Sequence, residues 1–337
     1  MRWFVLAALA ACTDSAKPAP PAASSAPAVS AAPTPPAAGA SLALPPAKAG
    51  LVDTAVADGL LANGKPALVR LLDPGKEPRQ PLRYAFTVGQ KQAVELRMTI
   101  EMDLKGQPKQ PLPDLVFSLE LTAASKPSAT ETTIEGVIRK VHVQAKSDAE
   151  KAMVPGFENN LRGVVGMGFS YVCSAEGRLH DVALRGNQPN GAAAQMLEQL
   201  KQSFDSMVAP LPTEPIGVGA RWQTLSRLRT VAEVLQLTTF TLRDRSDRTG
   251  TSKSADEVFT LDTDIKQLAA SPAIVMGGIT GTLKEWQSTG SGNLQIALNR
   301  LAPTQAQGSL RTHMIETMPG VDTMTVDTVM DLHVRAP

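Results

Sequence analysis

The stretch Val94-Glu95-Leu96-Arg97-Met98-Thr99-Ile100-Glu101-Met102-Asp103-Leu104 alternates apolar and polar side chains almost without a break. Successive side chains of a β-strand point to opposite faces of its sheet, so this stretch predicts a long strand with one buried and one solvated face. One-sided burial of this kind is typical of antiparallel sheets. The same pattern returns near the end of the chain, where every second position is occupied by Met324, Val326, Thr328, Met330, Leu332 and Val334.

Weaker versions of the pattern occur elsewhere in the chain, and together with these two stretches they predict about a dozen strands. The predicted strands fall within residues 82–88, 94–104, 115–121, 134–138, 169–173, 179–184, 222–231, 234–243, 257–265, 279–286, 293–298, 307–318 and 324–334. Turns are expected at Glu176-Gly177 and at Gly290-Ser291-Gly292. So many long strands do not stay flat in one sheet. We therefore predict a mainly β (α+β) fold, in which a strongly curved antiparallel sheet forms an incomplete β-barrel with helix packed on its concave face.

One long amphipathic helix is expected to interrupt the strands, over residues 190–208, with Asn190 as its cap. Its apolar face would carry Met196, Leu197, Leu200, Phe204, Met207 and Val208. The order of strands, helix and strands predicts two similar halves, residues 80–185 and 216–335, although the letters show no clean repeat. A shorter helix is expected near residues 53–63.

The N-terminus carries Leu9-Ala10-Ala11-Cys12 after a short apolar run. This segment resembles the lipobox of bacterial lipoproteins: Arg2 supplies the positive charge, and residues 3–9 are too few to span a bilayer. The resemblance implies that Cys12 is lipidated and that residues 1–11 are removed as a signal peptide. The alternative is ordinary cleavage after Ala10, which leaves an unmodified cysteine near the new terminus.

Lipidation would place the protein in the bacterial cell envelope, anchored to a membrane through the lipid on Cys12. The residue after Cys12 is Thr13 rather than Asp, which by the sorting rule of enteric lipoproteins favours the outer membrane, although Asp14 follows. Residues 12–50 are nearly all Ala, Pro and Ser, a composition that predicts a disordered linker. We interpret the linker as a tether, with low-complexity filler as the alternative, and expect residues 51–337 to form the globular domain.

The segment from Pro210 to Trp222, Pro-Leu-Pro-Thr-Glu-Pro-Ile-Gly-Val-Gly-Ala-Arg-Trp, resembles a Pro-rich turn followed by Val-Gly-x-x-Trp in uncharacterised bacterial lipoproteins. Those proteins often have an acidic residue where this chain has Ala220. The order of long strands around a helix is also similar to the half-barrel of the lipoprotein-carrier (LolA/LolB-like) superfamily. The second resemblance implies a concave apolar cavity for acyl chains or lipoproteins, and neither resemblance transfers catalytic residues.

Composition limits the partners of the chain. Loss of Arg2 with the signal peptide lowers the Lys and Arg count from 33 to 32, which equals the 32 Asp and Glu. A chain without basic excess is not expected to bind nucleic acid. With Cys12 lipidated, Cys173 has no disulfide partner, and we interpret it as a buried apolar residue. We expect a monomer.

Chemistry-bearing motifs are scarce in the sequence. It contains no Gly-x-Ser-x-Gly, P-loop or His-Glu-x-x-His motif, and Gly163-Val-Val-Gly-Met-Gly168 is interpreted as a turn into a strand. The four histidines, which we expect to be surface or hydrogen-bonded residues without a metal or catalytic role, are His142, His180, His313 and His333. We predict no catalytic site, no metal site and no cofactor.

Methionines mark the expected apolar face. Their flexible thioethers suit a surface that adapts to varied apolar partners, although core filling is the simpler interpretation. The residues predicted to line a hydrophobic ligand cavity are Met98, Met102, Met196, Leu200, Phe204, Met207, Met314 and Met330.

Two functions follow from these features. The first is a non-catalytic lipoprotein that binds a lipid, an acyl chain or an apolar peptide in a concave cavity. The second is an envelope scaffold that has a filled core and acts through protein–protein contacts. An enzyme is a third class, which no residue pattern supports.

Overall fold

The computed structural model describes residues 41–107, 110–185, 208–229, 231–247, 257–276, 279–320 and 323–336. Cys12, the linker up to residue 40 and the expected helix up to residue 207 lie outside them. The lipidation of Cys12 and the packing of that helix on the concave face therefore stay predictions. So do the positions of Met196, Leu200, Phe204 and Met207.

The predicted mainly β fold is confirmed. Twelve antiparallel strands form one sheet in the order β1-β8-β9-β10-β11-β12-β13-β2-β4-β5-β6-β7, and the short β3 pairs with β2. Their bounds are β1 Leu68–Asp73, β2 Lys91–Leu104, β3 Gln110–Pro111, β4 Asp114–Ser128, β5 Glu131–Gln144, β6 Gly168–Ser174, β7 Leu179–Arg185, β8 Arg221–Arg229, β9 Ala232–Asp247, β10 Glu257–Met276, β11 Ile279–Ala297, β12 Gln305–Thr317 and β13 Met324–Arg335.

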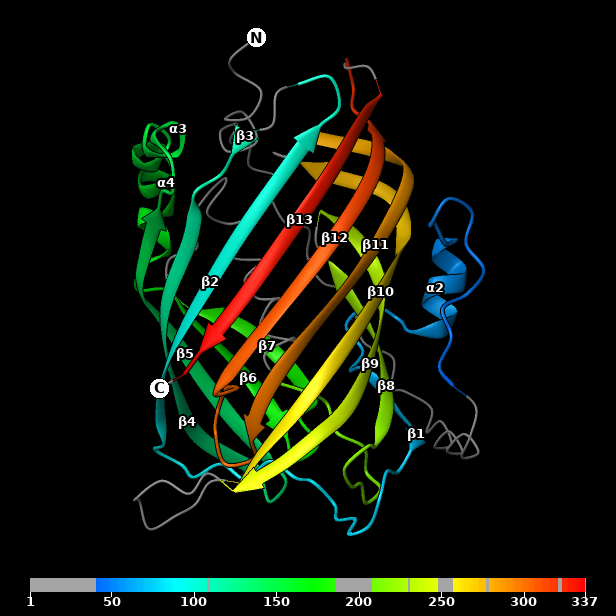
Figure 1. Ribbon diagram of the computed structural model, residues 1–337, viewed down its shortest axis with the longest axis vertical. Helices are drawn as coiled ribbons and strands as arrows, with labels where there is room; N and C mark the ends of the chain where they lie inside the picture. The colour runs from blue at the N-terminus through cyan, green and yellow to red at the C-terminus, as the bar shows by residue number, and fades with distance from the viewer. Residues whose placement is uncertain are drawn as a thin grey trace, which may run out of the picture.

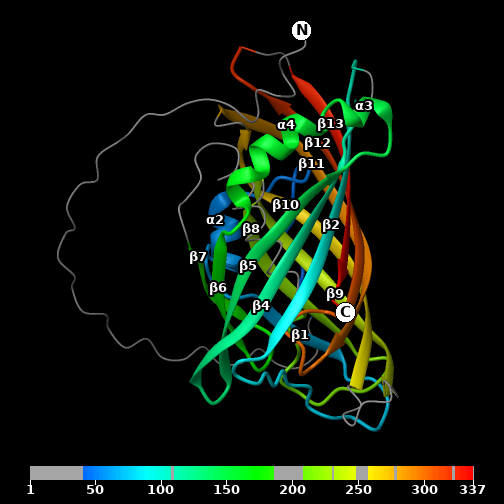
Figure 2. The ribbon, with the colours of Figure 1, turned by 90° about the vertical axis from the view of Figure 1, so that its left-hand side faces the viewer.

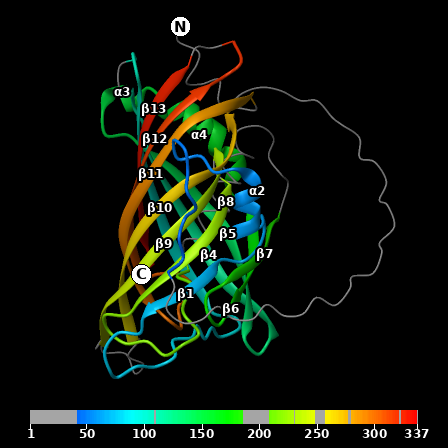
Figure 3. The same cartoon turned by 90° about the vertical axis from the view of Figure 1, so that its right-hand side faces the viewer.

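The sheet is strongly curved but does not close, because β1 and β7 are both edge strands. Figure 1 shows β2, β13, β12 and β11 as the front wall, with β6 and β7 behind them. The side views in Figures 2 and 3 show the long strands wrapping around a common interior. The strands of the two expected halves are contiguous in this order, and they meet where β13 pairs with β2.

The helices are short, and they are α2 Thr54–Leu60, α3 Asp148–Lys151, α4 Val154–Leu161 and the 3-10 turn η1 Arg162–Val164. The expected lead-in helix is therefore present as α2, and Asp53 caps it by accepting a hydrogen bond from the Ala55 backbone. α2 packs on the convex side of the sheet, where Ala57 and Leu61 contact Leu225 and Leu235. Helices α3 and α4 were not predicted, and α4 lies beside β5 (Figure 2).

The larger core cluster, here called the aromatic core, draws residues from strands all across the sheet. Only the inside of a curved sheet can bring such distant strands together, so this cluster defines the concave face. Its aromatic members are Tyr84, Phe86, Phe117, Phe169, Tyr171, Trp222, Phe240 and Phe259. Cys173, as predicted, is buried within it.

A second cluster, here called the methionine core, lies towards the other end of the strands. Its buried members are Ala232, Val234, Ala269, Ile274, Leu283, Trp286, Met314 and Val326, and its half-buried margin is Leu51, Met102, Leu104, Leu228, Val231 and Met318. The segment before α2 reaches this core through a loop at Ala49 and Gly50, which lies between β10 and β11. The Ala49 carbonyl accepts from the Trp286 amide, and the Gly50 carbonyl accepts from the Ala269 amide, both at 2.9 Å.

Two local predictions were wrong. Gly290-Ser291-Gly292 is not a turn, because β11 runs through it. A side chain at Gly290 would lie 2.6 Å from the Ser309 carbonyl oxygen, so the glycines serve close strand contact instead. Residues 82–88 alternate in burial but form no strand, because their backbone bonds go to separate loops: the Tyr84 amide to Ala175 and the Ala85 amide to Leu298.

Candidate functional site: the concave face between the two cores

A belt of hydrogen-bonded polar side chains crosses the concave face beside the methionine core. The polar belt consists of Gln236, Thr238, Gln267, Ser288 and Thr312, contributed by four neighbouring strands. Gln267 donates to Gln236 at 2.8 Å, and Ser288 donates to Gln267 at 2.8 Å and lies 3.0 Å from the Thr312 hydroxyl. The side chains satisfy one another, so the belt is stable inside an otherwise apolar interior.

Next to the belt, the register places apolar side chains in two rows across β10 to β2. These residues, here called the apolar strip, are Ile265, Leu310, Met330 and Ile100 in one row, and Leu332 and Met98 in the next. All six are half-buried, whereas the core residues on either side are buried. The strip is thus apolar surface of the concave face that stays half-buried, like the margin of the methionine core.

Three glycines lie beside the strip. Gly290 pairs with Leu310, and Gly292 pairs with Gly308, which in turn pairs with Leu332. A side chain at Gly290 or Gly292 would lie 2.6 or 2.5 Å from a backbone oxygen of β12, so these two glycines allow close strand contact. At Gly308 the nearest atom would be 3.6 Å away, so this glycine leaves the face shallow beside Leu332.

The convex face of the same strands has the opposite character. Positions next to the strip residues carry Arg97, Glu101, Arg311, Asp331 and His333. His313 and Asp327 form an ion pair on this face, with 2.7 Å between Nδ1 and Oδ1. The half-buried apolar surface of β2, β12 and β13 is therefore directed inwards.

The described methionines of the predicted cavity all lie on this concave face. Met98 and Met330 belong to the apolar strip, Met102 lies at the margin of the methionine core, and Met314 is buried within that core. The register brings Met330 opposite both Leu310 and Ile100. Whether these residues contact a ligand stays a prediction.

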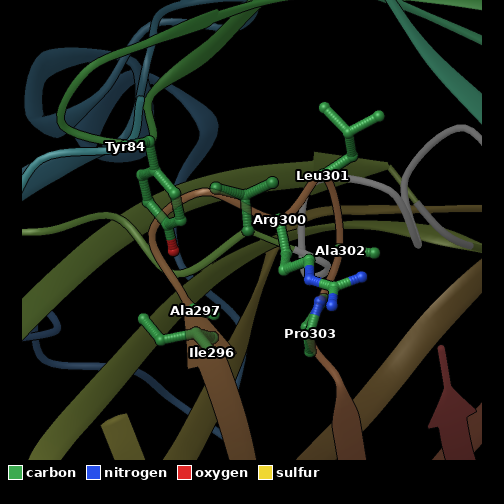
Figure 4. Close-up of a pocket in the computed structure, with 8 residues that line it drawn as sticks. Tyr84, Ile296, Ala297, Arg300, Leu301, Ala302 and Pro303 are labelled. Carbon is green, nitrogen blue, oxygen red and sulfur yellow. The ribbon is translucent and has the colours of Figure 1, made fainter. Parts of the chain in front are cut away.

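The enclosed pockets described by the structure are small. Figure 4 shows one between Tyr84 and the residues around the β11–β12 loop, Ile296 to Pro303, which has no room for a water molecule. Another, beside Cys173 and Ala175, has a volume of about 90 Å³. Ligand pockets usually exceed about 300 Å³. Neither of these two pockets has room for a lipid.

Sequence reasoning missed a buried carboxyl group beside the methionine core. Glu316 is 0% exposed, and neither of its carboxyl oxygens has a hydrogen-bond partner. Burial raises the pKa of this carboxyl group, because no charged partner compensates for the lost water. The signal was present in the alternation Met314-x-Glu316-x-Met318, which puts the carboxyl on the apolar face of its strand.

Several other titratable groups on the sheet have a partner of opposite charge, among them the buried Asp114 and the partly exposed His180. His180 lies 3.2 Å from Glu131 and 3.0 Å from Asp181, and it is partly exposed. Among the residues that the structure describes, no group of three or more His, Cys, Asp or Glu side chains is arranged to hold a metal ion. In that same part of the chain, no helix is long and apolar enough to cross a membrane.

Comparisons with known proteins add no relative to this description. No protein-family model matches the chain, and the search of curated proteins finds no match either.

Proposed function

We propose that this protein is a membrane-anchored lipoprotein of the cell envelope that binds a hydrophobic ligand without catalysing a reaction. The ligand, a lipid, an acyl chain or an apolar peptide, would lie along the apolar strip on the concave face. The observation that carries the proposal is the direction of the half-buried apolar surface: Met330 and Leu310 face inwards, while their strand neighbours Asp331 and Arg311 face outwards.

The anchor in this proposal is the lipid on Cys12, attached in the outer membrane and followed by the linker of residues 12–50. Labelled palmitate should be incorporated into the wild-type chain and not into Cys12→Ser. Cys173→Ser is the matched control, since Cys173 is the other cysteine and is buried in the aromatic core. Equal labelling of Cys12→Ser and wild type would exclude the anchor.

The binding site can be tested with the full chain in lipid vesicles and a photoreactive palmitate carrying a diazirine. Irradiation should attach the probe to peptides from β2, β12 and β13. Met330→Asp puts a charge on the strip and should lower this labelling at least about fivefold, because burying a charge in an apolar site is costly. Val329→Asp, the adjacent position on the convex face, should leave the labelling unchanged.

The alternative function is an envelope scaffold that acts through protein–protein contacts. The observation that favours it is the open sheet, whose edge strands β1 and β7 can pair with a strand from another protein. A scaffold predicts that the photoreactive palmitate does not label the strip and that chemical cross-links to other proteins start from β1 or β7. Equal palmitate labelling of wild type and Met330→Asp would also favour the scaffold.

A further inference from the structure

Two buried polar side chains without partners lie in neighbouring positions of the methionine core. The Glu316 carboxyl oxygens and the Trp286 indole nitrogen Nε1 are buried, and none of them makes a hydrogen bond. Glu316 lies opposite Leu283, and Trp286 lies opposite Met314, so the two residues occupy adjacent rows of the same concave face. Leaving a buried donor or acceptor unpaired costs about 1–3 kcal/mol, so two together call for a physical reason.

The side chains that face Glu316 are apolar on every strand packed around it. They are Leu283 on β11, Met314 on its own strand, Met324 and Val326 on β13, and Met102 and Leu104 on β2. The described residues place no cation within ion-pair distance of the carboxyl. Burial raises the pKa of Glu316, which favours the protonated form. In its protonated form the Glu316 carboxyl is a hydrogen-bond donor, as the Trp286 indole is.

We propose that Glu316 and Trp286 form the head-group site for the carboxyl end of an acyl ligand, a free fatty acid, whose chain extends from there to the apolar strip. This inference rests on the proposed function and names its ligand class. A ligand carboxyl group offers acceptor oxygens to both donors, and it can share a proton with Glu316. An ammonium head group would instead need an ionised Glu316, which the apolar surroundings disfavour.

The distance along the sheet suits an extended ligand. Six residues of β12 separate Glu316 from Leu310, which corresponds to about 20 Å at roughly 3.4 Å per residue. Between them lies the polar belt, whose Ser288 and Thr312 hydroxyls are already paired with each other. The methionines around Glu316 have flexible side chains that can move aside when a ligand enters.

Displacement of the photoreactive palmitate from the full chain in vesicles tests the head-group site. Palmitic acid and hexadecylamine have the same chain and differ in the head group. Palmitic acid should displace the probe from the wild-type chain at least about tenfold better than hexadecylamine does. Glu316→Leu and Trp286→Phe should each weaken displacement by palmitic acid roughly fivefold, the effect of one lost hydrogen bond.

Glu285→Leu is the matched control, because it removes a carboxyl group next to Trp286 that lies off the concave face. It should leave displacement unchanged, and thermal unfolding would show that each variant is folded. Better displacement by hexadecylamine, or unchanged displacement in both Glu316→Leu and Trp286→Phe, would overturn the head-group site while leaving the strip intact. A wild-type chain that takes up no probe would overturn both this site and the proposed function.

Discussion

The aromatic core and the methionine core lie on the same concave face, yet they are built differently. In the aromatic core, large rings stack and two of them donate hydrogen bonds: the Trp222 indole donates to the Pro210 carbonyl at 2.8 Å and stacks on Phe240, and the Tyr84 hydroxyl donates to the Ala209 carbonyl at 3.2 Å. In the methionine core, Trp286 is the aromatic residue, and its indole nitrogen is unpaired.

The difference indicates two tasks for one sheet. Rigid, stacked rings fix one arrangement of a core, whereas methionine side chains adapt to several. The segments around Tyr84 and Ile216 bind backbone to backbone near the aromatic core and tie that end together. We infer that the aromatic core supplies most of the stability and that the methionine core is packed more adaptably.

The largest effect should come from Trp222→Ala in the aromatic core. Deleting this fully buried ring leaves a cavity and should lower the free energy of unfolding by about 3–5 kcal/mol. Met102→Ala at the half-buried margin of the methionine core should cost less than about 2 kcal/mol, because its surroundings can adjust. Urea unfolding of both variants gives the comparison. Equal losses would show that the two cores are equally rigid.

Gly50→Ala should have the next largest effect on the free energy of unfolding, because Gly50 lies in the loop that joins the segment before α2 to the methionine core. Gly50 has a φ of +75°, and a side chain there would lie 1.6 Å from the Trp286 carbonyl oxygen. We expect a loss of about 2–3 kcal/mol from strain and from displacement of the loop.

Gly59→Ala in α2 is the control for Gly50→Ala, since nothing lies within 4 Å of a side chain at that position. Alanine in a helix should be neutral or slightly stabilising there. Thermal unfolding measures both changes. A Gly50→Ala chain as stable as Gly59→Ala would mean that the loop at Ala49 and Gly50 contributes nothing to the methionine core.

The sequence was sufficient to predict the long strands, but it was insufficient to predict the structure of the segments that connect them. The alternation in residues 94–104 and 324–334 correctly predicted β2 and β13, because one-sided burial leaves a period of two in any long strand. It failed at residues 82–88, where the same period arises from an extended segment bound to two loops. Local pattern cannot distinguish these cases, because the partners of the backbone are far away in the chain.

The candidate site was predictable only in part. The alternation placed Met98, Met102, Met314 and Met330 on apolar faces, and the register confirms that they share one face. It could not reveal that Glu316 lacks a partner, because that depends on which side chains β11, β13 and β2 bring to it. Helix α3 had a local signal that was overlooked: the Ser147 side chain accepts from the Glu150 amide, and Glu150 accepts from the Lys146 amide.

Glu316→Leu should stabilise the protein modestly and weaken its fatty-acid binding. The pKa of Glu316 is raised above its ordinary value of 4.5 by burial, so above that pH the folded chain binds more protons than the unfolded chain. Stability therefore falls as the pH rises from 4.5 through the folded-state pKa. The variant should lose this fall and gain roughly 1 kcal/mol at pH 8, the cost of an unpaired buried group.

Glu316→Gln separates the two causes of that gain. It removes the titrating carboxyl group but keeps an unpaired polar group. Its free energy of unfolding should therefore not show the pH dependence caused by Glu316, and it should not increase as it does in Glu316→Leu. Urea unfolding between pH 4.5 and 8 measures all three chains. A wild-type pH profile that matches both variants would show that Glu316 is charged and partnered in the folded protein.

The smallest effect is expected at His180, which is the paired and partly exposed counterpart of the buried, unpaired Glu316. Desolvation lowers the pKa of His180, but hydrogen bonds with Asp181 and Glu131 outweigh it and raise the pKa above 6.5. Its contribution to stability is therefore complete below pH 6.5 and is lost as the pH rises through the folded-state value. Because the pair is solvent-screened, His180→Gln should cost less than about 1 kcal/mol at pH 6 and nothing at pH 9.

His333→Gln, on the convex face of β13, is the control in the same unfolding experiment. A His180→Gln loss that persists at pH 9 would mean that the imidazole acts through packing, and the contrast between paired surface charges and the unpaired Glu316 would then rest on Glu316 alone.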